Sequence, residues 1–187
     1  MEDFVRRAIF ASSVALLCLI MAPTAAAEQS TATGLRLDTT SFTTDRLPPR
    51  GDASAILADL EYEDAQTPRL FQTDINGDAA VDYIVEAAPS LCGNGGCPYA
   101  VVDGRTIEHL GTFFGSLLIL LDQKINHFPI AQSYSPNGAG RGTFTTYVFD
   151  SQDYQVVSLV DLSGASLEVL LKKLGTFRKL EPRKKSR

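Results

Sequence analysis

The residues with the clearest chemical potential form a short acidic loop. Over nine positions the chain reads Asp74-Ile75-Asn76-Gly77-Asp78-Ala79-Ala80-Val81-Asp82. Calcium is a hard cation that takes six to eight oxygens, and a chain curled around the ion presents them from alternate positions 1, 3, 5, 7 and 9. We therefore predict a Ca²⁺ site whose ligands are listed here: the side chains of Asp74, Asn76, Asp78 and Asp82, and the carbonyl oxygen of Ala80.

This loop departs from the EF-hand pattern in ways that predict weak binding. Val85 stands at position 12, where a bidentate Glu is expected, and Glu86 comes one residue late. In a strand Glu86 points to the opposite face from Val85. The dissociation constant for calcium is then expected at ~10⁻⁴ to 10⁻³ M, as in extracellular modules. The alternative is a metal-free turn rich in Asx residues. Repulsion between three unneutralised Asp side chains favours calcium.

The second chemical feature is a pair of cysteines in the segment Cys92-Gly93-Asn94-Gly95-Gly96-Cys97. In an oxidising compartment cysteines this close form a disulfide. The intervening glycines let the short ring close, and the chain-entropy model gives a stabilisation of only ~2 kcal/mol. A zinc site or a catalytic dithiol is the weaker alternative.

The N-terminus reads as a cleavable signal peptide over residues 1–27. A basic pair, Arg6-Arg7, precedes an uncharged apolar run over residues 8–22, and Ala25-Ala26-Ala27 supplies the small residues of a cleavage site. The apolar run has about 15 residues, fewer than the ~20 that span a bilayer. The sequence thus predicts a periplasmic or secreted protein with no transmembrane span after cleavage.

Charge is distributed unevenly along the rest of the chain. Residues 28–171 contain 19 acidic and 7 basic residues, whereas residues 172–187 contain 8 basic residues and one acidic residue. An acidic, exported body is a poor nucleic-acid binder. The basic tail is either a solvated, disordered segment or a tether to an anionic surface, where each basic residue contributes ~1 kcal/mol.

The remaining pattern predicts an α+β protein that is mostly β. Helical spacing of Ala53, Ile56, Leu57 and Leu60 after Asp52, a candidate N-cap, predicts a helix. Residues 167–174 form either a strand or a second helix, and their apolar spacing favours the helix. Short strands separated by turns predict an antiparallel, sandwich-like meander. The expected strands are residues 69–73, 81–88, 98–102, 106–113, 116–121, 130–134, 143–149 and 154–160. Turns are expected at residues 122–126, 135–138 and 150–153.

The domain organisation follows from these elements. Residues 1–27 are the signal peptide, and residues 28–50, rich in Ser and Thr, are expected to be a disordered lead-in. Residues 51–175 form a single β-rich domain, and residues 176–187 a basic disordered tail.

The acidic loop resembles the calcium loops of FG-GAP and VCBS-type β-repeats, which join two strands with an Asp-x-Asp/Asn-Gly-Asp-Gly-x-x-Asp pattern. Ala79 replaces the second Gly of that pattern. Followed by Cys-Gly-x-Gly-Gly-Cys, the loop also resembles a group of uncharacterised secreted bacterial proteins. That resemblance spans residues 71–157 and implies a small periplasmic domain without naming an activity.

These features favour a non-enzymatic binding module that contacts an envelope protein or a wall glycan. The first alternative is a cell-wall glycan hydrolase that uses a carboxylate pair drawn from Asp150, Asp153 and Asp161; these residues also suit turns. The second is an inhibitor of a host or rival enzyme, with the Cys92–Cys97 loop as its contact. A cleft with two acids favours the hydrolase, whereas an exposed apolar patch above a few hundred Å² favours the binding module.

Overall fold

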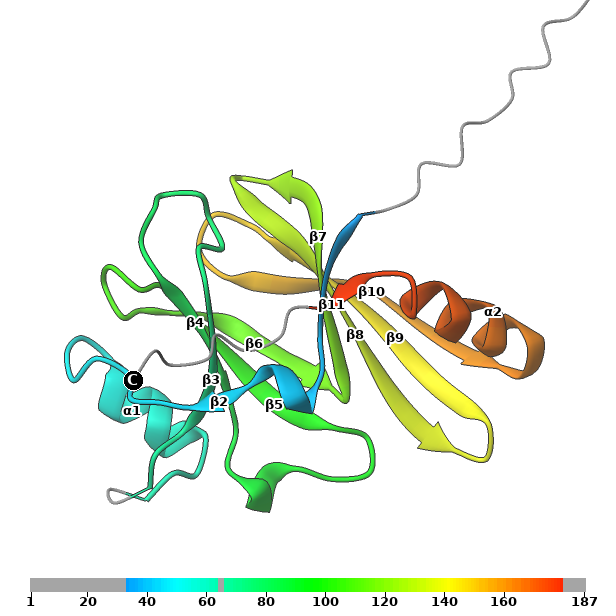
Figure 1. The fold of residues 1–187 in the computed structure, drawn as a ribbon, viewed down its shortest axis with the longest axis horizontal. Coiled ribbons are helices and arrows are strands. Elements are labelled where there is room, and N and C mark those ends of the chain that lie inside the picture. The colour runs from blue at the N-terminus through cyan, green and yellow to red at the C-terminus, as the bar shows by residue number, and fades with distance from the viewer. Residues whose placement is uncertain (1–32, 64–65, 180–187) are drawn as a thin grey trace, which may run out of the picture. The chain divides into compact units, whose positions relative to one another are not determined.

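A computed structural model describes residues 33–63 and 66–179, so the predicted signal peptide lies outside the described residues. Two β-sheets and two helices make up the described chain, which confirms the mostly-β α+β class (Figure 1). Neither helix has the length and apolar character needed to span a bilayer.

The first sheet has six strands in the order β10-β9-β8-β7-β1-β11. Their bounds are β1 Gly34–Leu37, β7 Leu117–Ile125, β8 Phe128–Gly138, β9 Arg141–Phe149, β10 Tyr154–Ser163 and β11 Arg178–Lys179. Strands β7 to β10 form an antiparallel meander, as predicted, and among the described strands only β1 and β11 pair in parallel.

The second sheet has five antiparallel strands in the order β2-β3-β4-β5-β6. Their bounds are β2 Thr43–Thr44, β3 Arg69–Thr73, β4 Asp82–Glu86, β5 Cys97–Val102 and β6 His109–Gly115. Two 3₁₀ turns, η1 Thr39–Ser41 and η2 Pro89–Leu91, lie before β2 and after β4.

The two sheets pack face to face, and helix α1 (Ala53–Asp59) covers the other face of the five-stranded sheet. Successive residues of a strand point to opposite faces. In β4, Ile84 accordingly joins the core between the sheets while Val85 joins the core under α1. Because both of its faces are buried, β5 reads as a nearly continuous apolar run.

Helix α2 (Gly164–Leu174) links the two edges of the six-stranded sheet, because it follows β10 and precedes β11. It must therefore cross a face of that sheet, and the inner face is already occupied by the five-stranded sheet. Ile119 lies on the outer face, opposite Leu118 and Leu120, and is fully buried. Leu167 and Leu174 of α2 are also buried. The predicted second helix is therefore confirmed.

Four expectations are corrected. The lead-in is not disordered over residues 33–50, because β1 is paired with β7 and Leu37 is fully buried. Residues 178–179 are not part of a disordered tail, because they form β11, which pairs with β1. The predicted turns at 122–126 and 135–138 belong largely to β7 and β8, whose turns lie a few residues further on. Asp52 stands at the N-cap of α1, but its side chain makes no capping hydrogen bond.

Candidate functional site

The acidic loop joins β3 to β4, so its flanks are strands as the sequence predicts. The side-chain oxygens of the loop accept backbone N–H groups of the same loop. Asp74 accepts from Gly77 at 2.6 Å and from Ala79 at 3.0 Å. Asp78 accepts from Ala80 at 2.7 Å, and its own N–H donates to Asn76 at 2.9 Å. The chain is thereby wrapped tightly around its own carboxylates.

Ala79 stands where the resembled calcium loops have glycine, and it adopts the left-handed backbone conformation that glycine would provide. Its φ is +65°, and that of Gly77 is +85°. A non-glycine residue is strained in this region. The loop therefore keeps the left-handed turn at this position despite the substitution.

Asp82 is the most buried acidic residue of the loop, with 1% of its surface exposed. One carboxylate oxygen accepts the Ile75 N–H and the other accepts the Gly104 N–H, both at 2.8 Å. Gly104 belongs to the turn between β5 and β6, and a Cβ there would lie 1.6 Å from the Val81 carbonyl oxygen. Asp82 thus ties two turns together. Burial raises its pKa, against the lowering effect of the two N–H groups.

Positive charge reaches the acidic loop from a neighbouring turn. The Arg105 guanidinium lies 3.1 Å from the Asp78 carboxylate and donates a hydrogen bond to the Asp78 carbonyl oxygen at 3.0 Å. Arg105 is largely exposed, so this ion pair stabilises the fold weakly. It nevertheless offsets part of the repulsion between the loop's carboxylates.

The chemistry of the donor set suits a hard cation, because all five predicted ligands are oxygens. Their arrangement does not present a formed metal site. Within residues 33–63 and 66–179, no three acidic, His or Cys side chains come together in a group that could hold a metal ion. Both Asp82 oxygens already accept N–H groups, and Arg105 pairs with Asp78. Calcium would therefore have to share these oxygens with their present partners or displace them.

The predicted disulfide is present in the second loop. Cys92 and Cys97 are joined, with their Cα atoms 4.3 Å apart. Gly93 and Gly96 exchange backbone hydrogen bonds across the ring at 2.9 and 3.0 Å. Gly96 has a φ of +122°, and a Cβ there would lie 1.9 Å from the Gly115 carbonyl carbon. Glycine is required at this position, where the ring lies against the end of β6.

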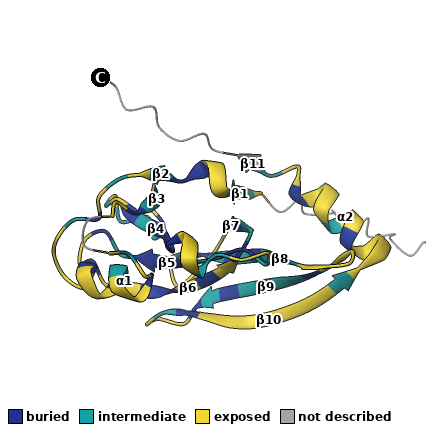
Figure 2. Ribbon diagram, turned by 90° about the horizontal axis from the view of Figure 1, so that it is seen from below, coloured by how far each residue is buried: buried dark blue, intermediate teal, exposed yellow. Residues whose placement is uncertain are grey.

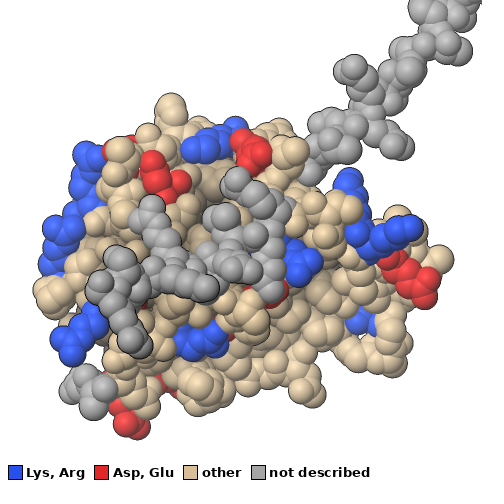
Figure 3. Space-filling view, viewed as in Figure 1, with Lys and Arg blue, Asp and Glu red and all other residues tan. Residues whose placement is uncertain are grey.

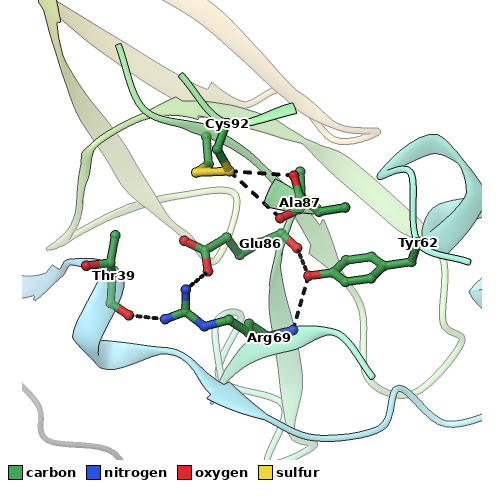
Figure 4. The surroundings of a disulfide bond; sticks show 8 residues. Thr39, Tyr62, Arg69, Glu86, Ala87 and Cys92 are labelled. Carbon is green, nitrogen blue, oxygen red and sulfur yellow. Dashed lines mark hydrogen bonds and ion pairs between the residues drawn. A yellow bond between two sulfur atoms is a disulfide. The ribbon is translucent and has the colours of Figure 1, made fainter. Parts of the chain in front are cut away.

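Close to the disulfide lies an ion pair between a buried glutamate and a partly exposed arginine, which sequence reasoning missed (Figure 4). Glu86 in β4 and Arg69 in β3 are directly opposed, and their charged atoms lie 2.5 Å apart. The Tyr62 hydroxyl donates to the Glu86 carbonyl oxygen and accepts the Arg69 N–H. Arg69 also donates to the Thr39 carbonyl oxygen. The strand register sets Arg69 opposite Glu86, and Tyr62 and Thr39 add contacts from outside the strands, so the cluster joins β3, β4 and the segments that carry these two residues.

Burial raises the pKa of Glu86, and the nearby Arg69 guanidinium lowers it by less. Glu86 lies in β4, outside the acidic loop, as expected from its predicted position in a strand. Its partners are structural: Arg69 and Tyr99.

The carboxylates considered for glycan chemistry occupy turn and strand-end positions. Asp150 accepts the N–H groups of Gln152 and Asp153 in the β9–β10 turn, and these bonds lower its pKa. Asp161 lies near the other end of β10 and accepts a 2.6 Å hydrogen bond from Thr143. Asp161 is therefore separated from the other two by most of the length of β10.

The most unusual surface of the described chain is strand β10. Its apolar side chains Val156, Val157, Leu159 and Val160 are all exposed, by 57%, 58%, 63% and 45%. Figure 2 shows the strand exposed along nearly its whole length, beside the largely buried β9. Elsewhere, on the face shown in Figure 3, charged side chains stand singly or in small groups.

Comparison of the chain with protein-family models, curated proteins and solved structures finds no match to any of them. Function must therefore be inferred from the chain's own surfaces and clusters.

Proposed function

We propose that this chain is an exported binding module, periplasmic or secreted, whose principal contact surface is the exposed strand β10. One observation carries the proposal: the apolar side chains of β10, Val156 to Val160, face solvent instead of a core. Contiguous exposed apolar surface above a few hundred Å² marks interaction sites on soluble proteins. An open strand edge also offers unpaired backbone groups that bind an added strand.

The disulfide supports the location outside the cytoplasm. Disulfides persist in oxidising compartments and are rare in the cytosol. The Cys92–Cys97 bridge pins the segment between β4 and β5. Together with the predicted signal peptide, this supports delivery to the periplasm or the medium.

We further propose that calcium is a weak additional ligand of the acidic loop. The wrapped backbone, the left-handed Ala79 and the all-oxygen donor set support this assignment. Asp74, Asn76, Asp78 and the Ala80 carbonyl would hold the ion, and Asp82 would join them through lone pairs that its two N–H partners leave unused. A bound calcium ion would neutralise the loop's carboxylates, which Arg105 does only in part. The proposed role of calcium is to stabilise the fold.

The binding function is tested by affinity capture from the producing cell's envelope fraction, with and without a chelator. Three immobilised baits are compared: the parent, Leu159→Lys and Val169→Lys. Leu159 is on β10, whereas Val169 is an equally exposed apolar residue on α2, at 69%. We expect a specific envelope component, either protein or glycan, to be lost with Leu159→Lys alone. Equal capture by all three baits would show that β10 is not the contact surface.

A further inference from the structure

Strand β10 is an open edge of the six-stranded sheet. It pairs with β9 on one side and has no strand on the other among the described residues. In an edge strand half of the backbone N–H and C=O groups point away from the sheet. No backbone hydrogen bond to another described segment reaches residues 155–163 from that side.

This edge lacks most of the features that protect natural edge strands from pairing. Such strands are usually very short or carry Lys, Pro or inward-pointing charges. Strand β10 has ten residues and contains no Lys, Arg or Pro, and Asp161 is its only charged residue. A single irregularity between Val156 and Ser158 interrupts its pairing with β9. The remaining run to Ser163 is regular.

The other edges of the two sheets are better protected. Strands β2 and β11 have two residues each, which is too short to recruit a further strand. Strand β6 contacts β8 and β10 of the other sheet. In the described part of the chain, β10 is therefore the one long, open, apolar edge.

We propose that β10 pairs antiparallel with β10 of a second copy, joining the two six-stranded sheets across a two-fold axis. This inference rests on the proposed role of β10 as the contact surface, and it names a second copy of this chain as the component that this surface captures. Such an isologous contact uses the same edge of both copies, so the assembly closes at a dimer. It satisfies the free backbone groups of both strands and brings the exposed valines and leucines of each copy against those of the other.

Charge favours a second copy over an arbitrary partner. A partner strand must be apolar and nearly uncharged, because it lies along Val156 to Val160, and β10 itself meets that requirement. Antiparallel pairing centred on Leu159, which then lies opposite Leu159 of the second copy, separates the two Asp161 side chains. They lie four residues apart along the strand axis, or ~13 Å at 3.3 Å per residue. At the physiological Debye length of ~8 Å their repulsion is largely screened.

The test is the molar mass of the disulfide-intact mature protein, measured by sedimentation or light scattering over a wide concentration range. We expect twice the monomer mass for the parent and for Val169→Lys, and the monomer mass for Leu159→Lys. Leu159 is 63% exposed, so its replacement should leave the fold intact, which circular dichroism checks. A parent that stays monomeric at submillimolar concentration, or a dimer unaffected by Leu159→Lys, would overturn the proposal.

Hydrogen exchange supplies a second readout that needs no variant. Amides of residues 156–162 should exchange more slowly as protein concentration rises, while amides of β6 should not respond. The mass and capture experiments together also distinguish self-pairing of β10 from the proposed binding function. A monomeric parent that loses its envelope ligand on Leu159→Lys would refute self-pairing and leave the binding function standing.

Discussion

Asp82→Asn should destabilise the protein although it changes only one atom and removes a buried charge. Each carboxylate oxygen of Asp82 accepts one backbone N–H, from Ile75 and from Gly104. An amide has one accepting oxygen and one donating nitrogen. One of the two N–H groups must then face another donor in a site that is 1% exposed.

The magnitude follows from two opposing effects. Leaving a buried donor unsatisfied costs ~1–3 kcal/mol, and a hydrogen bond to a charged group contributes ~1.5–3 kcal/mol. Against this, the amide removes the cost of burying a charge, which is the effect that raises the pKa of Asp82. We expect a net loss of about 2 kcal/mol, which lowers Tm by roughly 4–8 °C for a domain of this size.

Urea unfolding of the mature, disulfide-intact protein measures this loss. Asp103→Asn is the matched control, because a single Asp103 oxygen accepts the N–H groups of both Arg105 and Thr106, together with the exposed Thr106 hydroxyl. An amide oxygen can take over the two N–H bonds, and the exposed hydroxyl can turn to water, so we expect a loss below ~0.5 kcal/mol, typical of surface substitutions. If Asp82→Asn lowers the unfolding free energy by no more than Asp103→Asn does, then the two N–H groups accepted by Asp82 are not the source of its stabilising effect.

Three further predictions concern pH, calcium and redox state. Burial raises the pKa of the Glu86 carboxyl above its ordinary 4.5, so the folded state favours the protonated form. The stability that protonated Glu86 contributes is therefore fully present below pH 4.5 and is lost as pH rises through the folded-state pKa. The unfolding free energy of the parent minus that of Glu86→Gln should therefore fall above pH 4.5; a rising difference in urea titrations would contradict this. Tenfold excess of calcium over Kd should add ~1.4 kcal/mol and raise Tm. Asp78→Ala should abolish that rise and Arg105→Gln should enlarge it, whereas a parent that does not respond would rule calcium out. Thiol titration of the unreduced mature protein should detect no free thiol, and reducing Cys92–Cys97 should cost ~2 kcal/mol in chemical unfolding; an unchanged midpoint would contradict the stabilising role.

Periodicity made the central strands and both helices predictable. The alternation of residues 143–149 predicts two faces, and Thr145, Tyr147 and Phe149 are indeed the buried one. The spacing of Leu167 and Leu174 predicts α2, and both side chains are buried. These patterns are local consequences of residues that point alternately or every fourth position toward a core.

Turn chemistry was the less reliable signal, because local preference competes with strand pairing. Ser135-Pro136-Asn137-Gly138 has strong turn residues, yet Pro136 pairs with Gly142 and the strand continues. A register shift between Pro136 and Gly138 accommodates the proline, which has no N–H to donate. Strand β7 likewise continues through Asp122 by a shift between Leu120 and Lys124.

Local residue patterns specify the chemistry of this chain: the oxygen-rich loop, the cysteines close enough to bridge and the alternation that builds a β-rich core. How these pieces meet depends on the tertiary structure. It set Arg69 opposite Glu86, placed the Gly104 N–H on Asp82 and brought Arg105 to Asp78. It also left β10 at the edge of its sheet. The physical reason is that register and strand order depend on contacts between residues far apart in the chain, which no local spacing encodes.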